Sequence, residues 1–127
     1  MPGALTHLAA GAAMFIIGRF YFKNYFEGVK NKNKESLILL FVCLFFSVIP
    51  DFFLIIYYLT YILPFEVFLI YHYLVIIVSG PLAIAIILIL KYQQVNIKRK
   101  PIIMMGMWCI LLHIAVDIFI ANNTIFI

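Results

Sequence analysis

The stretch IIMMGMWCILLHIAVDIFI, residues 102–120, is apolar except for His113 and Asp117. At about 1.5 Å of rise per residue, a helix of this length can cross a hydrocarbon core of about 30 Å. A charged side chain near the bilayer centre costs roughly 2.5 to 3.5 kcal/mol on insertion scales, so Asp117 needs a compensating partner. His113 is the candidate, because residues at i and i+4 share one face of a helix. The stretch therefore predicts a membrane-spanning helix with an imidazole and a carboxylate on one face.

The rest of the chain also has the composition of a membrane protein. Of its 127 residues, 67% are hydrophobic and 11% are charged, and the mean hydropathy is +1.16. These values lie far outside the range of soluble domains. Together with the quoted stretch, apolar segments cover approximately residues 4–22, 36–58, 63–90 and 102–120. We therefore predict an all-α, multi-pass integral membrane protein of the cell membrane, embedded in the lipid bilayer. Its fold should be a four-transmembrane-helix bundle that forms one domain over residues 1–127.

The positive charges predict the orientation of the bundle. Apart from Arg19, the lysines and arginines gather in two loops, near residues 23–35 and 91–100, whereas the turn near residues 58–64 has no cation. Cationic loops preferentially stay in the cytoplasm, so the turn and both chain ends should lie outside, an N-out and C-out arrangement. This topology signal accounts for the formal charge of +4, and we predict no nucleic-acid partner.

The ionisable residues inside the spans predict a site. His7, Asp51 and His72 lie in or at the ends of the other three apolar segments. With alternating spans and about 1.5 Å of rise per residue, they and the His113/Asp117 pair fall in the outer half of the bilayer. Reversing the orientation would move the group to the other leaflet without scattering it. We therefore expect these side chains to meet in the core of the bundle.

Imidazole nitrogen and carboxylate oxygen together are suitable ligands for divalent metal ions. We predict a metal site formed by His7, Asp51, His72, His113 and Asp117. Zinc suits this ligand set best, and manganese and iron are the other candidates. Asp117 could bind the metal itself or orient His113 from behind.

Each of these residues also has a purely structural interpretation. His7 could simply be hydrated at a helix start, and His72 could form an interhelical hydrogen bond. Asp51 could compensate the backbone carbonyl that the preceding proline frees. Glu66 lies just inside the outer turn, where a carboxylate reaches water, so we expect it at the interface. The expected convergence of the other side chains favours a shared site over these separate roles.

Two other functions agree with this composition. Intramembrane Asp and His residues are also parts of proton or cation relays. A relay predicts polar residues that continue to the inner face, yet only Ser47 and Ser79 lie beneath the predicted site. The second alternative is a structural or accessory membrane protein, in which the site only ties the helices together.

Small residues predict where the helices approach each other. Gly3, Gly11 and Gly18, with several alanines among them, give the first span a surface for close helix contact. Cys43 and Cys109 lie in apolar spans without CxxC spacing, so we interpret them as packing residues.

Several short motifs together resemble one protein family. They are Thr6-His7 followed by Gly11, Pro50-Asp51 at the end of an apolar run, His72 alone in the next span, and His113-Ile-Ala-Val-Asp117. Their order, over nearly the whole chain, is similar to that of the LexA-regulated, membrane-bound metal-dependent hydrolases. The chain departs from the family pattern at Phe53 and Leu54, which stand where the family has a second Asp and a His. It also lacks the family's Thr-His-Ser around His72, the His-Arg before it and the Thr-Pro after the last Asp.

The resemblance implies metal-assisted hydrolysis. His7, His72 and His113 would hold a divalent metal together with one of the two aspartates, and the other aspartate would act as general base, so Asp51 and Asp117 are the catalytic candidates. A site that holds two metals in relatives would hold one here. Since the site is expected within the bilayer, we expect a lipid or lipid-linked phosphoester that enters sideways as the substrate class.

Overall fold

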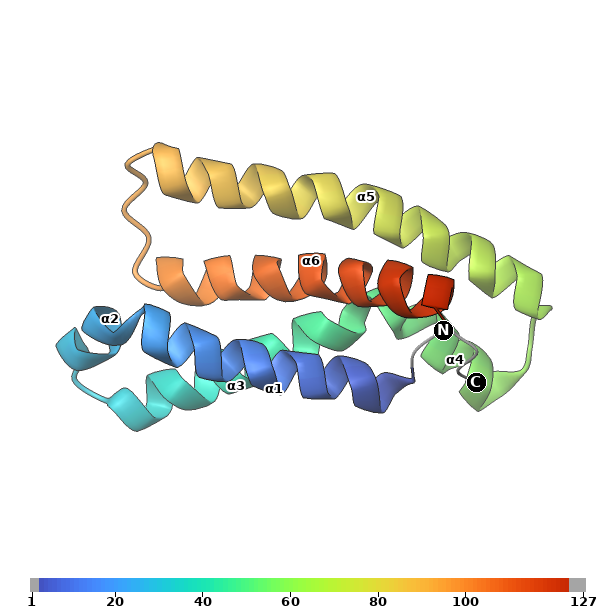
Figure 1. Ribbon diagram of the computed structural model, residues 1–127, viewed down its shortest axis with the longest axis horizontal. Helices are drawn as coiled ribbons and strands as arrows, with labels where there is room; N and C mark the ends of the chain where they lie inside the picture. The colour runs from blue at the N-terminus through green and yellow to red at the C-terminus, as the bar shows by residue number, and fades with distance from the viewer. Residues whose placement is uncertain (1–2, 124–127) are drawn as a thin grey trace.

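The computed structural model describes residues 3–123, and within this range all regular secondary structure is helical (Figure 1). The elements in chain order are α1 (Ala4–Tyr21), α2 (Lys23–Gly28), α3 (Lys32–Val48), a short 3-10 turn η1 (Ile49–Asp51), α4 (Phe52–Thr60), α5 (Phe65–Tyr92) and α6 (Lys100–Asn123). The long helices run side by side, with α2 and the α5–α6 connection at one end of the molecule and α4 at the other.

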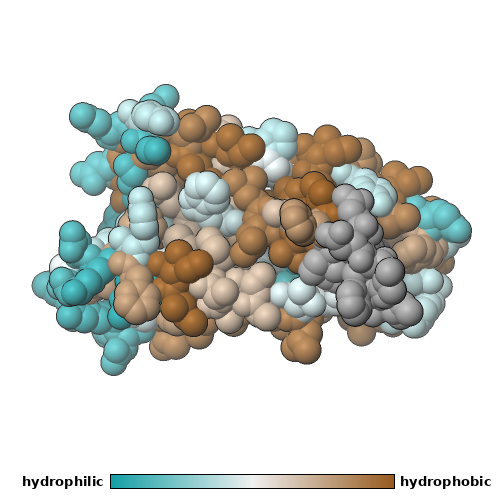
Figure 2. Space-filling view, viewed as in Figure 1, coloured by the Kyte–Doolittle hydropathy of each residue, from teal (hydrophilic) through white to brown (hydrophobic). Residues whose placement is uncertain are grey.

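Four helical segments are long and apolar enough to cross a membrane, namely Ala4–Tyr21, Lys32–Asp51, Phe65–Tyr92 and Lys100–Phe119. They confirm the predicted all-α architecture with four spans. The surface agrees with it, because Figure 2 shows apolar residues along the length of the molecule and hydrophilic residues gathered at the end where α2 lies. The N-out and C-out orientation stays a prediction, and residues 1–2 and 124–127 at the chain ends lie outside the described range.

Composition indicated one apolar segment over residues 36–58, but in the structure this segment is not one continuous helix. The α-helix α3 ends at Val48, and a 3-10 turn over Ile49–Asp51 leads into α4. The cause is Pro50, which has no N–H to donate and whose ring clashes with an α-helical continuation. Asp51 is therefore the last residue of the 3-10 turn, and its side chain does not point in the direction that a continued α3 would give it.

The first basic loop is also more ordered than predicted, because Lys23–Gly28 forms the short helix α2. Its Phe26 is only 2% exposed and packs into a core cluster with residues of α3 and α6. The Arg19 guanidinium lies 4.4 Å from the centre of the Phe26 ring, which adds a cation–π contact at the end of α1. The buried Phe26 ring therefore stabilises α2, a segment that the sequence predicted as a loop because of its lysines.

The helix α6 is the centre of the bundle, because it packs against α1, α3 and α5 (Figure 1). Cys43 and Cys109 are buried between α3 and α6, which confirms them as packing residues. Gly11 brings α1 close to α3, since a Cβ there would lie 2.6 Å from the Ser47 hydroxyl oxygen and 2.8 Å from the Cys43 carbonyl oxygen. Gly3 makes no such contact, so only part of the predicted small-residue surface is used.

A polar network closes the basic end of the bundle. The Glu35 carboxylate is buried and accepts hydrogen bonds from Arg99 Nε at 3.1 Å and Nη2 at 3.0 Å. The Tyr25 hydroxyl donates a third hydrogen bond to Glu35, at 3.0 Å. Burial, and then the contact with this carboxylate, raise the pKa of Tyr25. The sequence indicated Arg99 only as a topology signal. In the structure, its contact with Glu35 and the contact of Tyr25 with the same carboxylate join α2, the start of α3 and the segment before α6.

Candidate metal centre

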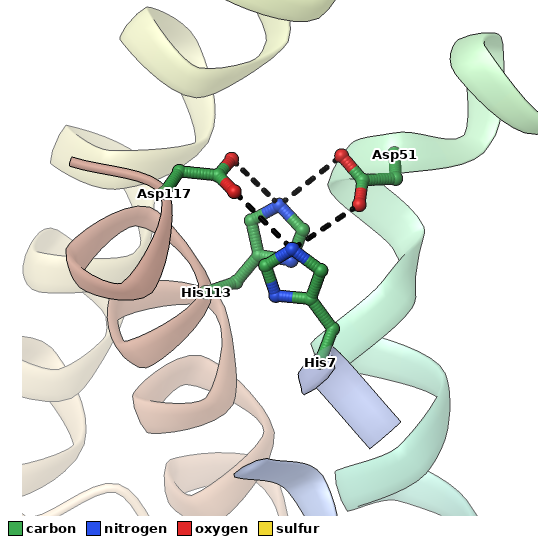
Figure 3. Close-up of side chains that lie close together, drawn as sticks. All are labelled: His7, Asp51, His113 and Asp117. Carbon is green, nitrogen blue, oxygen red and sulfur yellow. Dashed lines mark ion pairs between the residues drawn. The ribbon is translucent and has the colours of Figure 1, made fainter. Parts of the chain in front are cut away.

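Four buried side chains from distant parts of the chain converge at one point in the bundle (Figure 3). His7, Asp51, His113 and Asp117 each offer one ligand atom, and these atoms all lie within 4.8 Å of one another. The site lies near the start of α1 and the end of α6, away from the basic loops. The predicted convergence of these residues is therefore present, and the group could hold a metal ion.

Helix geometry explains how each side chain reaches this point. In α1, His7, Gly11 and Gly18 are the buried residues, so His7 points inward on the face that packs against α3. In α6, His113 and Asp117 lie one turn apart and point to the same side. Asp51 comes from η1, where the chain changes direction before α4. Close packing at Gly11 brings His7 near α3, and the break at Pro50 turns Asp51 toward His7. In regular, more widely spaced helices these two side chains would lie further apart.

The two carboxylates face two stacked imidazole rings. Asp117 Oδ1 lies 3.2 Å from His7 Nε2, and Asp117 Oδ2 lies 3.2 Å from His113 Nε2. Asp51 Oδ2 lies 3.4 Å from His7 Nε2, and Asp51 Oδ1 lies 3.5 Å from His113 Nε2 (Figure 3). The rings of His7 and His113 are 3.9 Å apart between centroids and inclined by 20°. Both Nε2 atoms therefore point into the space between the carboxylates.

Most of the polar atoms in this cluster are buried without a hydrogen-bond partner among the described residues. They are both ring nitrogens of His7, Nε2 of His113, Oδ1 of Asp51 and both carboxylate oxygens of Asp117. Buried polar groups are nearly always satisfied, because an unsatisfied group retains its full desolvation cost. So many unsatisfied ligand atoms around one point are typical of a cation-binding site.

The protonation of His113 is determined by its backbone contact. Its Nδ1 lies 2.6 Å from the carbonyl oxygen of Ser47, which can only accept a hydrogen bond. The proton of a neutral His113 ring therefore sits on Nδ1, and Nε2 presents a lone pair toward the carboxylates. Metal-binding histidines usually have this arrangement, with the second ring nitrogen donating to a carbonyl or carboxylate. Two acceptors that face each other need a cation between them, either a proton or a metal ion.

His72 lies beside the four-residue group rather than within it. Its Nδ1 is 3.2 Å from the Pro50 carbonyl oxygen and 3.3 Å from Asp51 Oδ1, and its Nε2 is 3.2 Å from Asp117 Oδ2. The side chain is only 1% exposed. His72 thus bridges both carboxylates and the broken end of α3, and the ligand role predicted for it stays a prediction. Glu66, by contrast, is exposed in the first turn of α5 and belongs to no described cluster, in agreement with the interfacial role expected of it.

An apolar groove has a volume of about 640 Å³. Its lining includes Leu8, which follows His7 in the sequence, and Ile49 and Phe52, which flank the Pro50-Asp51 pair. The remaining lining residues come from α3 and α4: Phe41, Leu44, Phe45, Val48 and Ile55. The lining of the groove thus extends across the break between α3 and α4.

No protein-family model matches the sequence, and no curated protein and no solved structure is significantly similar to it. The resemblance to the metal-dependent hydrolases thus stays a prediction based on short motifs. What the structure itself supports is a helical membrane protein with a buried His/Asp cluster that could bind a metal ion.

Proposed function

We propose that this chain is a membrane-embedded, metal-dependent hydrolase that acts on a lipid or lipid-linked phosphoester. The observation that carries the proposal is the set of unpartnered ligand atoms on His7, Asp51, His113 and Asp117, which converge within 4.8 Å. Ionisable residues inside a membrane are costly, and they are generally retained for function.

The distances in the cluster favour ligands of a common ion over direct ion pairs. Charge-assisted hydrogen bonds between nitrogen and carboxylate oxygen are about 2.7 to 2.9 Å long. The distances between Nε2 of His7 or His113 and the aspartate oxygens are 3.2 to 3.5 Å, longer than such hydrogen bonds. Zinc is our first choice of metal, with manganese and iron as the other candidates.

The two aspartates supply different functions in this proposal. When bound, a divalent metal supplies a water of lowered pKa and polarises the scissile group. Asp117, the i, i+4 neighbour of His113, completes the ligand set, and Asp51 accepts a proton as general base. The side chains of Asp51 and Asp117 are 11% and 10% exposed, whereas both oxygens of Asp117 and Oδ1 of Asp51 are buried.

The substrate class follows from the surroundings of the cluster. The apolar groove lined by Leu8, Ile49 and Phe52, which are sequence neighbours of cluster residues or of Pro50, suits an acyl chain, because apolar pockets of about 300 to 1,000 Å³ are typical ligand sites. Among residues 3–123, the ion pairs of Lys and Arg lie near the basic end of the bundle, and the cluster carboxylates pair with histidines alone. The metal would therefore be the main electrophile for a phosphoryl or carbonyl oxygen.

Elemental analysis of the detergent-purified protein tests the metal site. We expect about one divalent ion per chain, lost in His113→Ala and Asp117→Asn. It should be retained in Glu66→Gln, a matched change of an exposed carboxylate on α5. Equal metal content in all of these proteins would refute the site.

A second assay tests hydrolysis itself. The metal-loaded protein should release product from a panel of fluorescent phospholipids and lipid carboxylic esters, and chelation should stop the release. Asp51→Asn should abolish turnover.

A structural role of the metal is the competing function, and one observation favours it. The cluster joins α1, η1 and α6, and His72 of α5 contacts both of its carboxylates, so an ion bound there would tie together the first and last described helices. Metal binding at one ion per chain, together with loss of thermal stability on chelation and no turnover of any lipid, would establish this role in place of hydrolysis.

A further inference from the structure

A second large groove runs along the bundle between α1 and α5, with α6 as its floor. Its volume is about 660 Å³, and its walls include Ile17 of α1, Leu88 of α5 and Trp108 of α6. Both α1 and α5 pack against α6, which lies between them in Figure 1. This arrangement leaves an apolar face of α6 open to the surrounding lipid.

The groove has the length of one bilayer leaflet. On α6 it extends from Lys100 to Leu111, which at 1.5 Å per residue is about 16 Å, or about half of a 30 Å hydrocarbon core. Lys100 begins α6 and Lys91 lies in the last turn of α5, so the charged mouth lies at headgroup depth. The opposite end, at Leu111, then lies near the bilayer midplane.

The two ammonium groups at this mouth are not neutralised by the protein. Within residues 3–123, neither Lys91 nor Lys100 forms an ion pair. The carboxylates of Glu27 and Glu35 are already paired, with Lys23 and Arg99 respectively. A pair of lysines above an apolar groove between transmembrane helices is typical of sites for anionic lipid headgroups.

We propose that this groove binds one anionic phospholipid, with its phosphate between Lys91 and Lys100 and an acyl chain along α6 past Trp108. A second copy of this chain is a poorer occupant. An apolar helix face from a partner would cover both lysines and leave their charges unpaired, which is costly in a low-dielectric interface. The mouth of the groove lies at the basic end of the bundle, away from the His/Asp cluster, so this proposal does not depend on the proposed hydrolysis.

Native mass spectrometry of the full-length chain, released from detergent, tests the site. We expect phosphatidylglycerol to be retained in preference to phosphatidylcholine with the same acyl chains. In the double variant Lys91→Gln/Lys100→Gln, binding of phosphatidylglycerol should weaken roughly 30-fold, because each lysine near an anionic headgroup contributes about a fivefold preference. The matched control is Lys30→Gln/Lys34→Gln, which removes the same charge from the other basic loop and should bind like the unaltered protein.

A third variant separates the groove from its charge. Leu88→Trp fills the groove without altering any lysine, and it should also weaken phosphatidylglycerol binding. Glycerol phosphate, which has the anion but no acyl chain, should not compete. Equal retention of both lipids, equal losses in the two double variants, or a groove-filling variant with unaltered binding would overturn the proposal. Circular dichroism should show the same helix content in all variants, which shows that they are folded.

Discussion

His113 shows how a single backbone contact can prepare a side chain for metal binding. The Ser47 carbonyl oxygen, 2.6 Å from Nδ1, fixes the proton of the neutral ring on that nitrogen and leaves Nε2 free toward Asp117 and Asp51. This carbonyl lies one turn before the break at Pro50, in the turn of α3 where the Ser47 hydroxyl donates to the Leu44 carbonyl at 2.8 Å. The carbonyl is part of the main chain, so no side-chain substitution removes it.

The contacts of His72 predict a different response to mutation. Because His72 touches both carboxylates and the Pro50 carbonyl, we expect His72→Gln to weaken metal affinity by about 10- to 100-fold, as loss of an orienting partner does. His113→Gln removes a ligand atom and should abolish binding at the same metal concentration. Competition titration with a chelator of known affinity measures both, and equal losses in the two variants would contradict this division of roles.

The sequence predicted the chemistry of the cluster but not its internal order. His113 and Asp117 could be paired from their spacing alone, and alternating spans brought His7 and Asp51 to the same depth. That His72 lies beside the group, and that His7 and His113 stack, depends on side-chain packing across helices. No single-chain periodicity contains that information.

At the level of elements, the break between α3 and α4 presents Asp51 to the cluster. Pro50→Ala restores the missing N–H and allows the α-helix to continue, which would rotate Asp51 away from His7. We expect metal affinity to fall about tenfold or more, as when a supporting contact of a metal site is lost. Circular dichroism should show retained helix content. Unchanged affinity would mean that other contacts hold Asp51 in place.

The contact between α1 and α3 gives a second prediction at this scale. A Cβ at Gly11 would lie 2.6 Å from Ser47 Oγ and 2.8 Å from a backbone oxygen, so the helices must separate in Gly11→Ala. Forced overpacking typically costs about 1 to 3 kcal/mol. Gly28→Ala is the control, because nothing lies within 4 Å of a Cβ there. Unfolding in mixed micelles measures both variants, and equal stabilities would contradict the close contact.

The break also explains why the sequence predicted the second span incompletely. Hydropathy is high on both sides of Pro50, so composition indicated one segment over residues 36–58. The cost of a proline inside a helix is local and does not change the hydropathy, and only the coordinates show that α3 ends at Val48. The groove lined by Leu8 and Phe52 extends across the same break.

For the whole molecule, the four spans followed directly from composition, whereas the closure of the basic end did not. Glu35 and Arg99 are 64 positions apart in the chain and form a two-point contact between the start of α3 and the segment before α6. The sequence indicated Arg99 only as a topology signal, because a sequence gives the sign of a charge but not its distant partner. The orientation in the membrane still depends on that charge bias.

Cysteine labelling in intact cells tests this orientation. Lys30 and the 76%-exposed Ile62 lie on the surface at opposite ends of the bundle, whereas the native Cys43 and Cys109 are buried and give little background. If the basic loops are cytoplasmic, a membrane-impermeant maleimide should label Ile62→Cys and should label Lys30→Cys only after cell lysis. The reverse pattern would place the His/Asp cluster in the inner half of the bilayer.

The cluster takes His7 from the first span and Asp117 from the last. During synthesis on the ribosome, the amino-terminal helix enters the bilayer while most of the polypeptide has yet to be made. The His7 imidazole can meet Asp117 only after α6 has been synthesised and has left the translocon. A metal ion held by both residues would therefore bind only after α6 has entered the bilayer, and products truncated before α6 would not hold it.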